Sequence, residues 1–172
     1  MKKAVLADRT AKLFVMHYDL TAWCVRNVMR VPHFAFSLSV VECRAPLPAT
    51  ARRAGWIGCN ILLGQIPQPV PIPIVTNGEF QSRGKIREAY KRLRPLEKLQ
   101  IEKRGRTLDV LNVVGPLGKI EFKRPEFYAH SEELGKLHPE NHHVDEKIRQ
   151  QLQELRARGI LKFVEPGFYR LL

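Results

Sequence analysis

Hydrophobic residues in the first quarter of the chain fall in short stretches separated by polar positions. The stretches 13–18, 25–29 and 34–41 are rich in β-branched and aromatic residues, and Pro32 separates the second from the third. Such residues favour extended backbone, because their side chains pack well on a pleated surface. We therefore predict three strands in this region.

Proline and glycine dominate the next part of the pattern. Residues 44–60 are predicted to form a loop, because prolines, glycines and small side chains replace the apolar stretches. The proline-rich segment 66–80 suits an extended edge strand followed by a hairpin at Asn77-Gly78. Helical spacing appears in this half only at 82–93.

The second half has helical spacing. We expect a short helix at 106–114 ended by Gly115-Pro116, a second helix at 124–137 and a third at 141–159. Residues 160–172 then resemble two short strands around a turn. Three helices followed by a hairpin indicate a winged helix, so the fold class is α+β.

The third helix has the clearest amphipathic pattern, with Asn141 as its expected N-cap. One stripe is apolar and should face the core: Val144, Ile148, Leu152 and Leu155. The opposite face is centred on polar and charged side chains: Glu146, Gln150 and Gln153, with Lys147 and Arg149 at its flanks. A solvated amphipathic helix would show the same pattern.

This polar face suits contact with base edges. The third helix of such a module normally lies in the major groove, where Gln pairs with adenine and Arg with guanine. His142 and His143 stand at the helix start, where backbone N–H groups can take a phosphate. Together with His138 they do not form a credible metal site, because no carboxylate or cysteine completes the set.

Charge strengthens the case for a polyanionic partner. The 172 residues include 29 Lys and Arg against 17 Asp and Glu, a net charge of +12. The excess is concentrated at 83–106, so we divide the chain into a strand-rich part at 1–88, a basic linker at 89–104 and a winged helix at 105–172. A generically basic surface is the alternative.

Other features bound the class of protein. Cys24, Cys43 and Cys59 form no Cys-x-x-Cys pair and are expected to be buried free thiols. No apolar run is long enough for a membrane span, and charges interrupt the N-terminal segment too early for a signal peptide. We therefore expect a cytoplasmic protein with no membrane contact.

The loop at 49–60, "ATARRAGWIGCN", places Arg52 and Arg53 just before Trp56. A tryptophan here either enters the core with the apolar residues that follow it or contacts nucleic acid beside the arginines. The sequence pattern alone leaves both interpretations open.

Three segments, "ATARRAGWIGCNILL", "RTLDVLN" and the whole of 141–172, resemble the Dam-replacing (DpnI-like) family of methyl-directed type II restriction endonucleases. The resemblance covers essentially the whole chain. It implies the later, mostly strand part of a PD-(D/E)xK-type nuclease domain followed by a C-terminal winged helix. It also implies that the partner is double-stranded DNA carrying N6-methyladenine in G-A-T-C.

The resemblance also assigns individual residues. Seven positions match the family's motifs: Arg52, Arg53, Trp56, Lys147, Arg149, Gln150 and Gln151. Arg106 departs from the motif, which has an aromatic there. The wing tip departs too, since Glu165 and Pro166 stand where a basic residue would suit a phosphate.

The family's catalytic Asp, Glu-x-Lys and zinc-holding Cys-x-x-Cys pairs lie upstream of the segment that this chain resembles. We therefore expect neither catalytic residues nor a Mg²⁺ or zinc site in this chain. Asp109 with Glu121 and Lys123 imitates Asp…Glu-x-Lys in spacing, but these residues fall inside the winged helix.

Three functions remain open from the sequence. The first is binding of methylated G-A-T-C without cleavage, as a monomer. The second is an active site-specific deoxyribonuclease, if an upstream catalytic segment exists. The third is a winged-helix transcriptional regulator, which would act as a dimer on paired half-sites.

Overall fold

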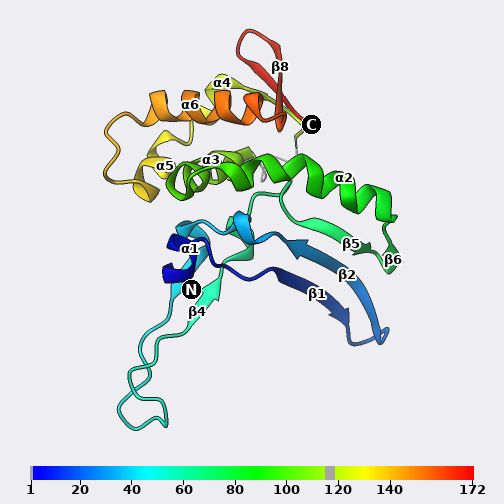
Figure 1. Ribbon diagram of the computed structural model, residues 1–172, viewed down its shortest axis with the longest axis vertical. Coiled ribbons are helices and arrows are strands. Elements are labelled where there is room, and N and C mark those ends of the chain that lie inside the picture. Colours follow the sequence, from blue (N-terminus) through cyan, green and yellow to red (C-terminus); the bar gives the residue numbers. More distant parts are fainter. Residues whose placement is uncertain (1, 115–118) are drawn as a thin grey trace.

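The computed structural model describes residues 2–114 and 119–172. A twisted sheet lies at one end of the molecule, two long helices cross its middle, and the winged helix lies at the other end (Figure 1). The sheet order is β1-β2-β5-β6, and every pair is antiparallel. Its strands are β1 (Leu13–Asp19), β2 (Cys24–Val31), β5 (Ile72–Thr76) and β6 (Glu79–Phe80).

The structure confirms the first two predicted strands and corrects the third. Residues 34–41 form two 3-10 turns, η1 (His33–Ala35) and η2 (Leu38–Val40), before the short strand β3 (Val41–Cys43). Phe34 and Val40 are buried there. A compact turn buries successive apolar residues, so the apolar run reflects burial and not a long strand.

The proline-rich segment forms the predicted hairpin but does not lie at the sheet edge. Asn77 and Gly78 both have positive φ, 52° and 85°, as a tight two-residue turn requires. β5 is an interior strand between β2 and β6. Its Pro73 is tolerated because β6 pairs only with Val75 and Thr76.

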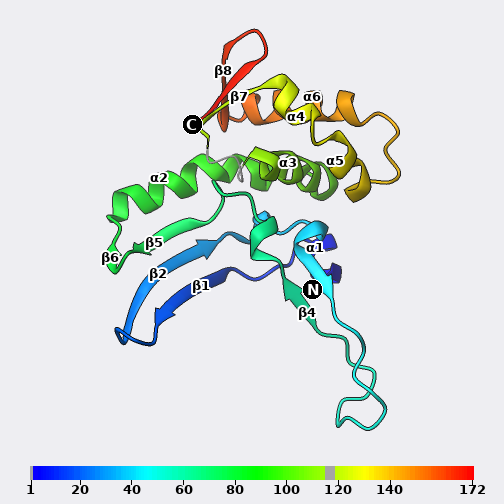
Figure 2. The same cartoon turned by 180° about the vertical axis from the view of Figure 1, so that it is seen from behind.

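The predicted loop is the exposed end of a protruding hairpin. β3 pairs with β4 (Cys59–Ile61), and the chain between them, 44–58, extends away from the body of the molecule (Figures 1 and 2). We call residues 44–58 the finger. Cys43 and Cys59, at its base, are exposed and Cys24 is half-buried, so the prediction of buried thiols was wrong.

The expected basic linker is helical. Ser82 caps α2 (Arg83–Leu93), whose helix continues through η4 (Arg94–Lys98) toward α3 (Ile101–Val114). α3 begins earlier than predicted because Arg104, in its first turns, is buried in an ion pair with Asp8 next to α1 (Lys2–Leu6). The predicted stop at Gly115-Pro116 lies outside the described residues.

The second half forms the predicted winged helix. The helices after α3 are α4 (Arg124–Tyr128), α5 (Ser131–Leu137) and α6 (Val144–Ala157), and the sheet has the order β7-β9-β8, from β7 (Glu121–Lys123), β8 (Leu161–Glu165) and β9 (Phe168–Leu171). The single helix predicted at 124–137 is interrupted. The Ser131 hydroxyl donates to the Tyr128 carbonyl at 2.7 Å, and His130 is not helical.

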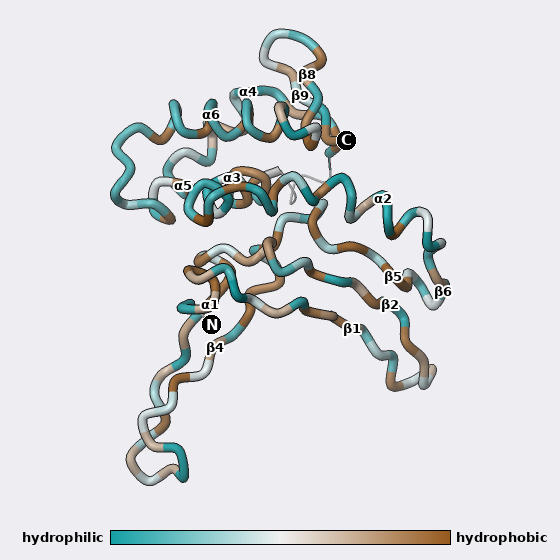
Figure 3. The backbone as a smooth tube through the Cα atoms, in the orientation of Figure 1, coloured by the Kyte–Doolittle hydropathy of each residue, from teal (hydrophilic) through white to brown (hydrophobic). Residues whose placement is uncertain are grey.

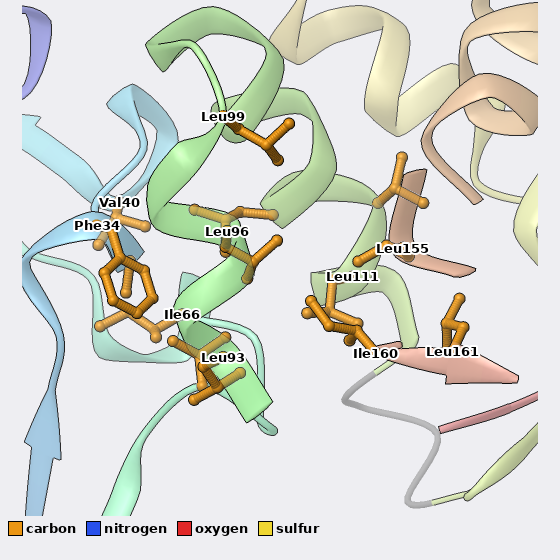
Figure 4. Close-up of a cluster of buried hydrophobic side chains, with 14 of the residues drawn as sticks. Phe34, Val40, Ile66, Leu93, Leu96, Leu99, Leu111, Leu155, Ile160 and Leu161 are labelled. Atoms are coloured by element: carbon orange, nitrogen blue, oxygen red, sulfur yellow. The ribbon is translucent and has the colours of Figure 1, made fainter. Parts of the chain in front are cut away.

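One hydrophobic core joins the two halves. Apolar colour is concentrated on the strands and on α3, whereas α2 and α6 carry more polar residues (Figure 3). Side chains from both halves meet in the close-up of Figure 4, from Phe34, Val40 and Ile66 through Leu93 and Leu96 to Leu111, Leu155 and Ile160. Burying each such side chain contributes roughly 1.5–3 kcal/mol.

Candidate nucleic-acid interface

α6 presents a polar face to solvent as its spacing predicted. Ile148, Leu152 and Leu155 are buried, and Val144 packs against the same core. The exposed residues on the other side include four of the expected contacts and one acid: His143, Arg149, Gln150, Gln153 and Glu146. Lys147 is half-buried, and its ammonium donates to Gln150 Oε1 at 3.2 Å.

Gln151 does not belong to this face. Its side chain is only 2% exposed, and its Oε1 accepts from the Thr107 hydroxyl of α3 at 2.7 Å. A side chain buried in this way has no path to a base edge, so the expectation that Gln151 contacts DNA is corrected. Helical geometry explains the difference, because position 151 adjoins the stripe of Ile148, Leu152 and Leu155.

Salt bridges and a hydrogen bond near the C-terminal end of α6 attach the helix to the rest of the molecule. Glu154 accepts from Lys103 of α3 and, at 3.0 Å, from Arg158 Nε. Arg158 in turn donates to the Pro95 carbonyl at 2.9 Å. The Lys103 hydrogen bond is the largest cause that lowers the pKa of Glu154. The exposed face of α6 is therefore held in one orientation.

The N-terminus of α6 differs from the prediction. The cap position is His143, without a side-chain cap, while Asn141 Oδ1 accepts from the His143 N–H at 3.1 Å. Asn141 therefore stabilises the approach to the helix instead of capping it. His142 and His143 are both exposed at this end. A helix start with positive partial charge beside two imidazoles suits a phosphate group.

The finger carries the other predicted contacts. Trp56 is 53% exposed, which excludes the interpretation of a core tryptophan, and Arg52 and Arg53 are exposed beside it. The backbone holds this arrangement: Leu47 N–H donates to the Trp56 carbonyl at 2.9 Å, and Trp56 N–H to the Arg53 carbonyl at 3.0 Å. The turn between them passes through Gly55, at φ 76°.

The indole ring lies over Gly58. A Cβ on Gly58 would come within 3.1 Å of Trp56 Cζ3 and 3.2 Å of Cη2. Glycine therefore allows the ring to fold back against the finger and limits its movement, while the outer ring surface stays in solvent.

The two sets of candidate residues lie at different ends of the molecule. The finger points away from the winged helix in both views, beyond the sheet (Figures 1 and 2). The structure therefore groups Arg52, Arg53 and Trp56 in one place and the α6 residues in another. It does not bring the two groups together.

Asp109, Glu121 and Lys123 do not converge on one site. Asp109 is buried, accepts from Ser39 at 2.6 Å and lies 2.8 Å from His138 Nε2. Glu121, in β7, pairs instead with Arg170. Within residues 2–114 and 119–172, no three His, Cys, Asp or Glu side chains are grouped to hold a metal ion. Nothing in the sequence indicated the Asp109–His138 pair.

A winged helix with a polar outer helix face, packed against a strand-rich part, is an architecture typical of DNA-binding proteins. Comparison with protein families agrees. Residues 1–99 match the Dam-replacing family, represented by DpnI, and residues 102–171 match the Dam-replacing HTH domain. The chain belongs to the Dam-replacing family, and its function is of the DNA-binding, methyl-directed restriction kind. No helix in the described part of the chain is long and apolar enough to cross a membrane.

Proposed function

We propose that this protein binds duplex DNA at G-A-T-C sites whose adenines are N6-methylated, and that it does so without cleaving them. The observation that carries the proposal is Trp56, a large apolar ring held in solvent beside two exposed arginines. Exposed tryptophan is costly to solvate, so an exposed ring in the same loop as two arginines suits an apolar group on a polyanion.

The methyl group supplies that apolar partner. The N6 atom of adenine is exposed in the major groove, and a methyl on it projects there. Burying one methyl or methylene group contributes about 0.8 kcal/mol. A G-A-T-C site carries two such methyl groups, one on each strand, so contact with both would favour the methylated duplex by roughly tenfold.

The arginines and α6 have separate roles in this proposal. Arg52 and Arg53 hold the finger against phosphates, which fixes its position without reading sequence. Because α6 lies at the other end of the molecule from the finger, it contacts a separate stretch of DNA, where Gln150 and Gln153 pair with adenine edges and Arg149 with guanine. Lys147, His142 and His143 contact phosphates around the helix start.

Fluorescence anisotropy tests the proposal directly. The full chain is titrated against one G-A-T-C duplex, methylated or unmethylated on both adenines, at several salt concentrations. We expect about tenfold tighter binding to the methylated duplex, with Trp56→Ala removing most of that preference. Arg52→Ala should weaken binding to both duplexes by the same factor. Equal binding to both duplexes by the parent protein would contradict methyl recognition.

Parallel measurements separate the other two functions. Incubation of the methylated duplex with Mg²⁺ tests for cleavage, and a cut product would establish the site-specific deoxyribonuclease instead. Gel filtration tests the proposed monomer. A dimer that prefers paired half-sites and ignores methylation would establish a winged-helix regulator.

A further inference from the structure

The exposed positive charge of this protein is not evenly distributed, because many basic residues are neutralised by acids. Ion pairs occupy Lys103, Arg104, Lys119, Lys136, Arg158 and Arg170. By contrast, the exposed basic side chains of α2 make no ion pair within the described residues: Arg83, Lys85, Arg87, Lys91 and Arg92. Unpaired cations keep their full capacity to displace counterions from a polyanion.

Part of this helix lines an open groove of about 840 Å³. The groove lies between α2, β5 and the end of α6, so both halves of the molecule contribute to it. Its lining includes the basic side chains of Lys85, Lys91 and Arg92, the acidic side chain of Glu88, and Arg158, which is ion-paired with Glu154. None of these residues belongs to the finger or to the exposed face of α6.

We propose that this groove, which we call the α2 groove, binds the phosphate backbone of duplex DNA independently of base sequence. Lys85 and Arg92 lie on the same face of α2, two helical turns apart. Seven residues correspond to about 10 Å along the helix axis, which matches the axial rise of about three nucleotides of one strand. The pair therefore has the spacing to contact two phosphates of one strand.

Arg158 gives the groove a fixed element. Its Nε is held by Glu154 at 3.0 Å and one terminal nitrogen by the Pro95 carbonyl at 2.9 Å. Among the described residues, 2–114 and 119–172, no side-chain bond of this kind holds Lys85, Lys91 or Arg92, so these side chains can adjust to a phosphate. Glu88 lies among them and should repel the same phosphate, so it reduces the affinity of the present groove.

Binding of the DNA backbone in the α2 groove rests on the proposed function, DNA binding. The experiment distinguishes failure of the groove from failure of methyl recognition. Binding is measured by anisotropy over a salt series on two duplexes, one with methylated G-A-T-C and one lacking that sequence. The variant is Lys85→Ala with Arg92→Ala. The matched control is Arg83→Ala with Arg87→Ala, which removes two exposed charges from the same helix outside the groove.

The slope of log affinity against log salt is negative. We expect it to become less negative by about 1.8 in the groove variant on both duplexes, since each lost phosphate contact removes about 0.9. Preference for the methylated duplex should not change. The control variant should keep the parent slope, and Glu88→Gln should tighten binding to both duplexes. Tighter binding by Glu88→Gln cannot come from unfolding, so this variant tests the groove even if the Lys85→Ala, Arg92→Ala protein does not fold.

A parent-like slope for the groove variant would overturn the proposal. So would an equal loss in the control variant, which would mean that net charge alone matters. Failure of methyl recognition appears separately, as equal parent binding to the methylated and unmethylated duplexes. The duplex without G-A-T-C still tests the groove in that case.

Discussion

The Thr107 hydroxyl of α3 donates to Gln151 Oε1 of α6 across 2.7 Å, and both side chains are buried. The core around this polar pair includes Leu108, Leu111 and Leu152, and the ion pair of Lys103 with Glu154 also joins the two helices. Because hydrogen bonds are directional, the pair fixes how far α6 is rotated about its own axis. That rotation decides which side chains α6 presents to solvent.

Removal of one partner should affect stability unequally. Thr107→Val leaves the Gln151 amide buried without this partner and should cost about 1–3 kcal/mol. Gln151→Leu should cost less, because the Thr107 hydroxyl still lies 2.7 Å from the Lys103 carbonyl. The double variant should be close to the parent, since both polar groups are then gone. Urea denaturation measures all three.

The same variants decide the role of Gln151 in DNA binding. Gln151→Leu should bind DNA within a few-fold of the parent, whereas Gln150→Ala should lose a base contact worth about 1–3 kcal/mol. Loss of binding in Gln151→Leu at unchanged stability would show that Gln151 contacts DNA after all.

Gly58→Ala should shift the Trp56 ring slightly from its place over the finger. The added Cβ would lie 3.1 Å from the indole ring, so the ring must move, although the exposed finger can accommodate this without unfolding. We expect methyl preference to fall, but by less than in Trp56→Ala, because the ring is still present. Gly64→Ala is the control, because a Cβ there meets nothing within 4 Å. If Gly58→Ala keeps the parent preference for the methylated duplex, the position of the Trp56 ring does not determine methyl recognition.

Cys43 and Cys59 should form a disulfide when oxidised. The register of β3 and β4 places Cys43 directly opposite Cys59. The neighbouring pair, Arg44 and Gly58, is a hydrogen-bonded pair, because the Arg44 N–H donates to the Gly58 carbonyl at 3.0 Å. Cys43 and Cys59 are therefore a non-hydrogen-bonded pair, with Cα atoms about 4.5 Å apart, within the range for a disulfide.

Glutathione disulfide is a suitable oxidant, since it takes the two thiol hydrogens and leaves as two glutathione molecules. The protein should lose the mass of two hydrogen atoms, and closing the 44–58 loop should add about 3 kcal/mol of stability. Cys24→Ser should behave as the parent, whereas Cys43→Ser has no partner thiol for Cys59 and should stop at a mixed disulfide in which one glutathione is attached and one is released. A parent protein that forms only mixed disulfides would contradict the register of β3 and β4.

Acid should weaken the attachment of α6. The pKa of Glu154 is lowered in the folded protein, first by the Lys103 hydrogen bond, so its ionised form stabilises the fold. That stabilisation is present above the usual pKa of 4.5 and is lost as the pH falls through the lowered folded value. In Lys103→Met, stability should depend less on pH in this range, as measured by thermal unfolding. Glu154→Gln should show a similarly flattened profile.

The sequence predicted those elements whose pattern is set by local chemistry. The stripe of α6 and the Asn77-Gly78 turn depend on residues close in the chain, and both were found. The run at 34–41 was misassigned because burial and strand formation favour the same residue types. The helical turns at 94–98 and 101–104 were missed because their stability depends on burial of Leu96 and Arg104 against distant segments.

The candidate site was predicted in the same uneven way. Exposure of Trp56 depends on hairpin backbone bonds that no motif shows, so the sequence left two interpretations open. Gln151 was assigned through family resemblance, although its place beside the apolar stripe already indicated burial. The α2 groove could not be predicted, because its residues lie far apart in the chain, from Lys85 to Arg158.

The core that runs from Phe34 to Leu155 without a break makes the two family-matched segments a single cooperative unit. They should melt in one transition, with no separately folded half. A ligand that binds only the folded state raises the melting temperature of everything in that unit. DNA held on α6 alone will therefore protect the distant sheet against unfolding and proteolysis. Protection measured in one half of the molecule thus reveals DNA bound to the other half.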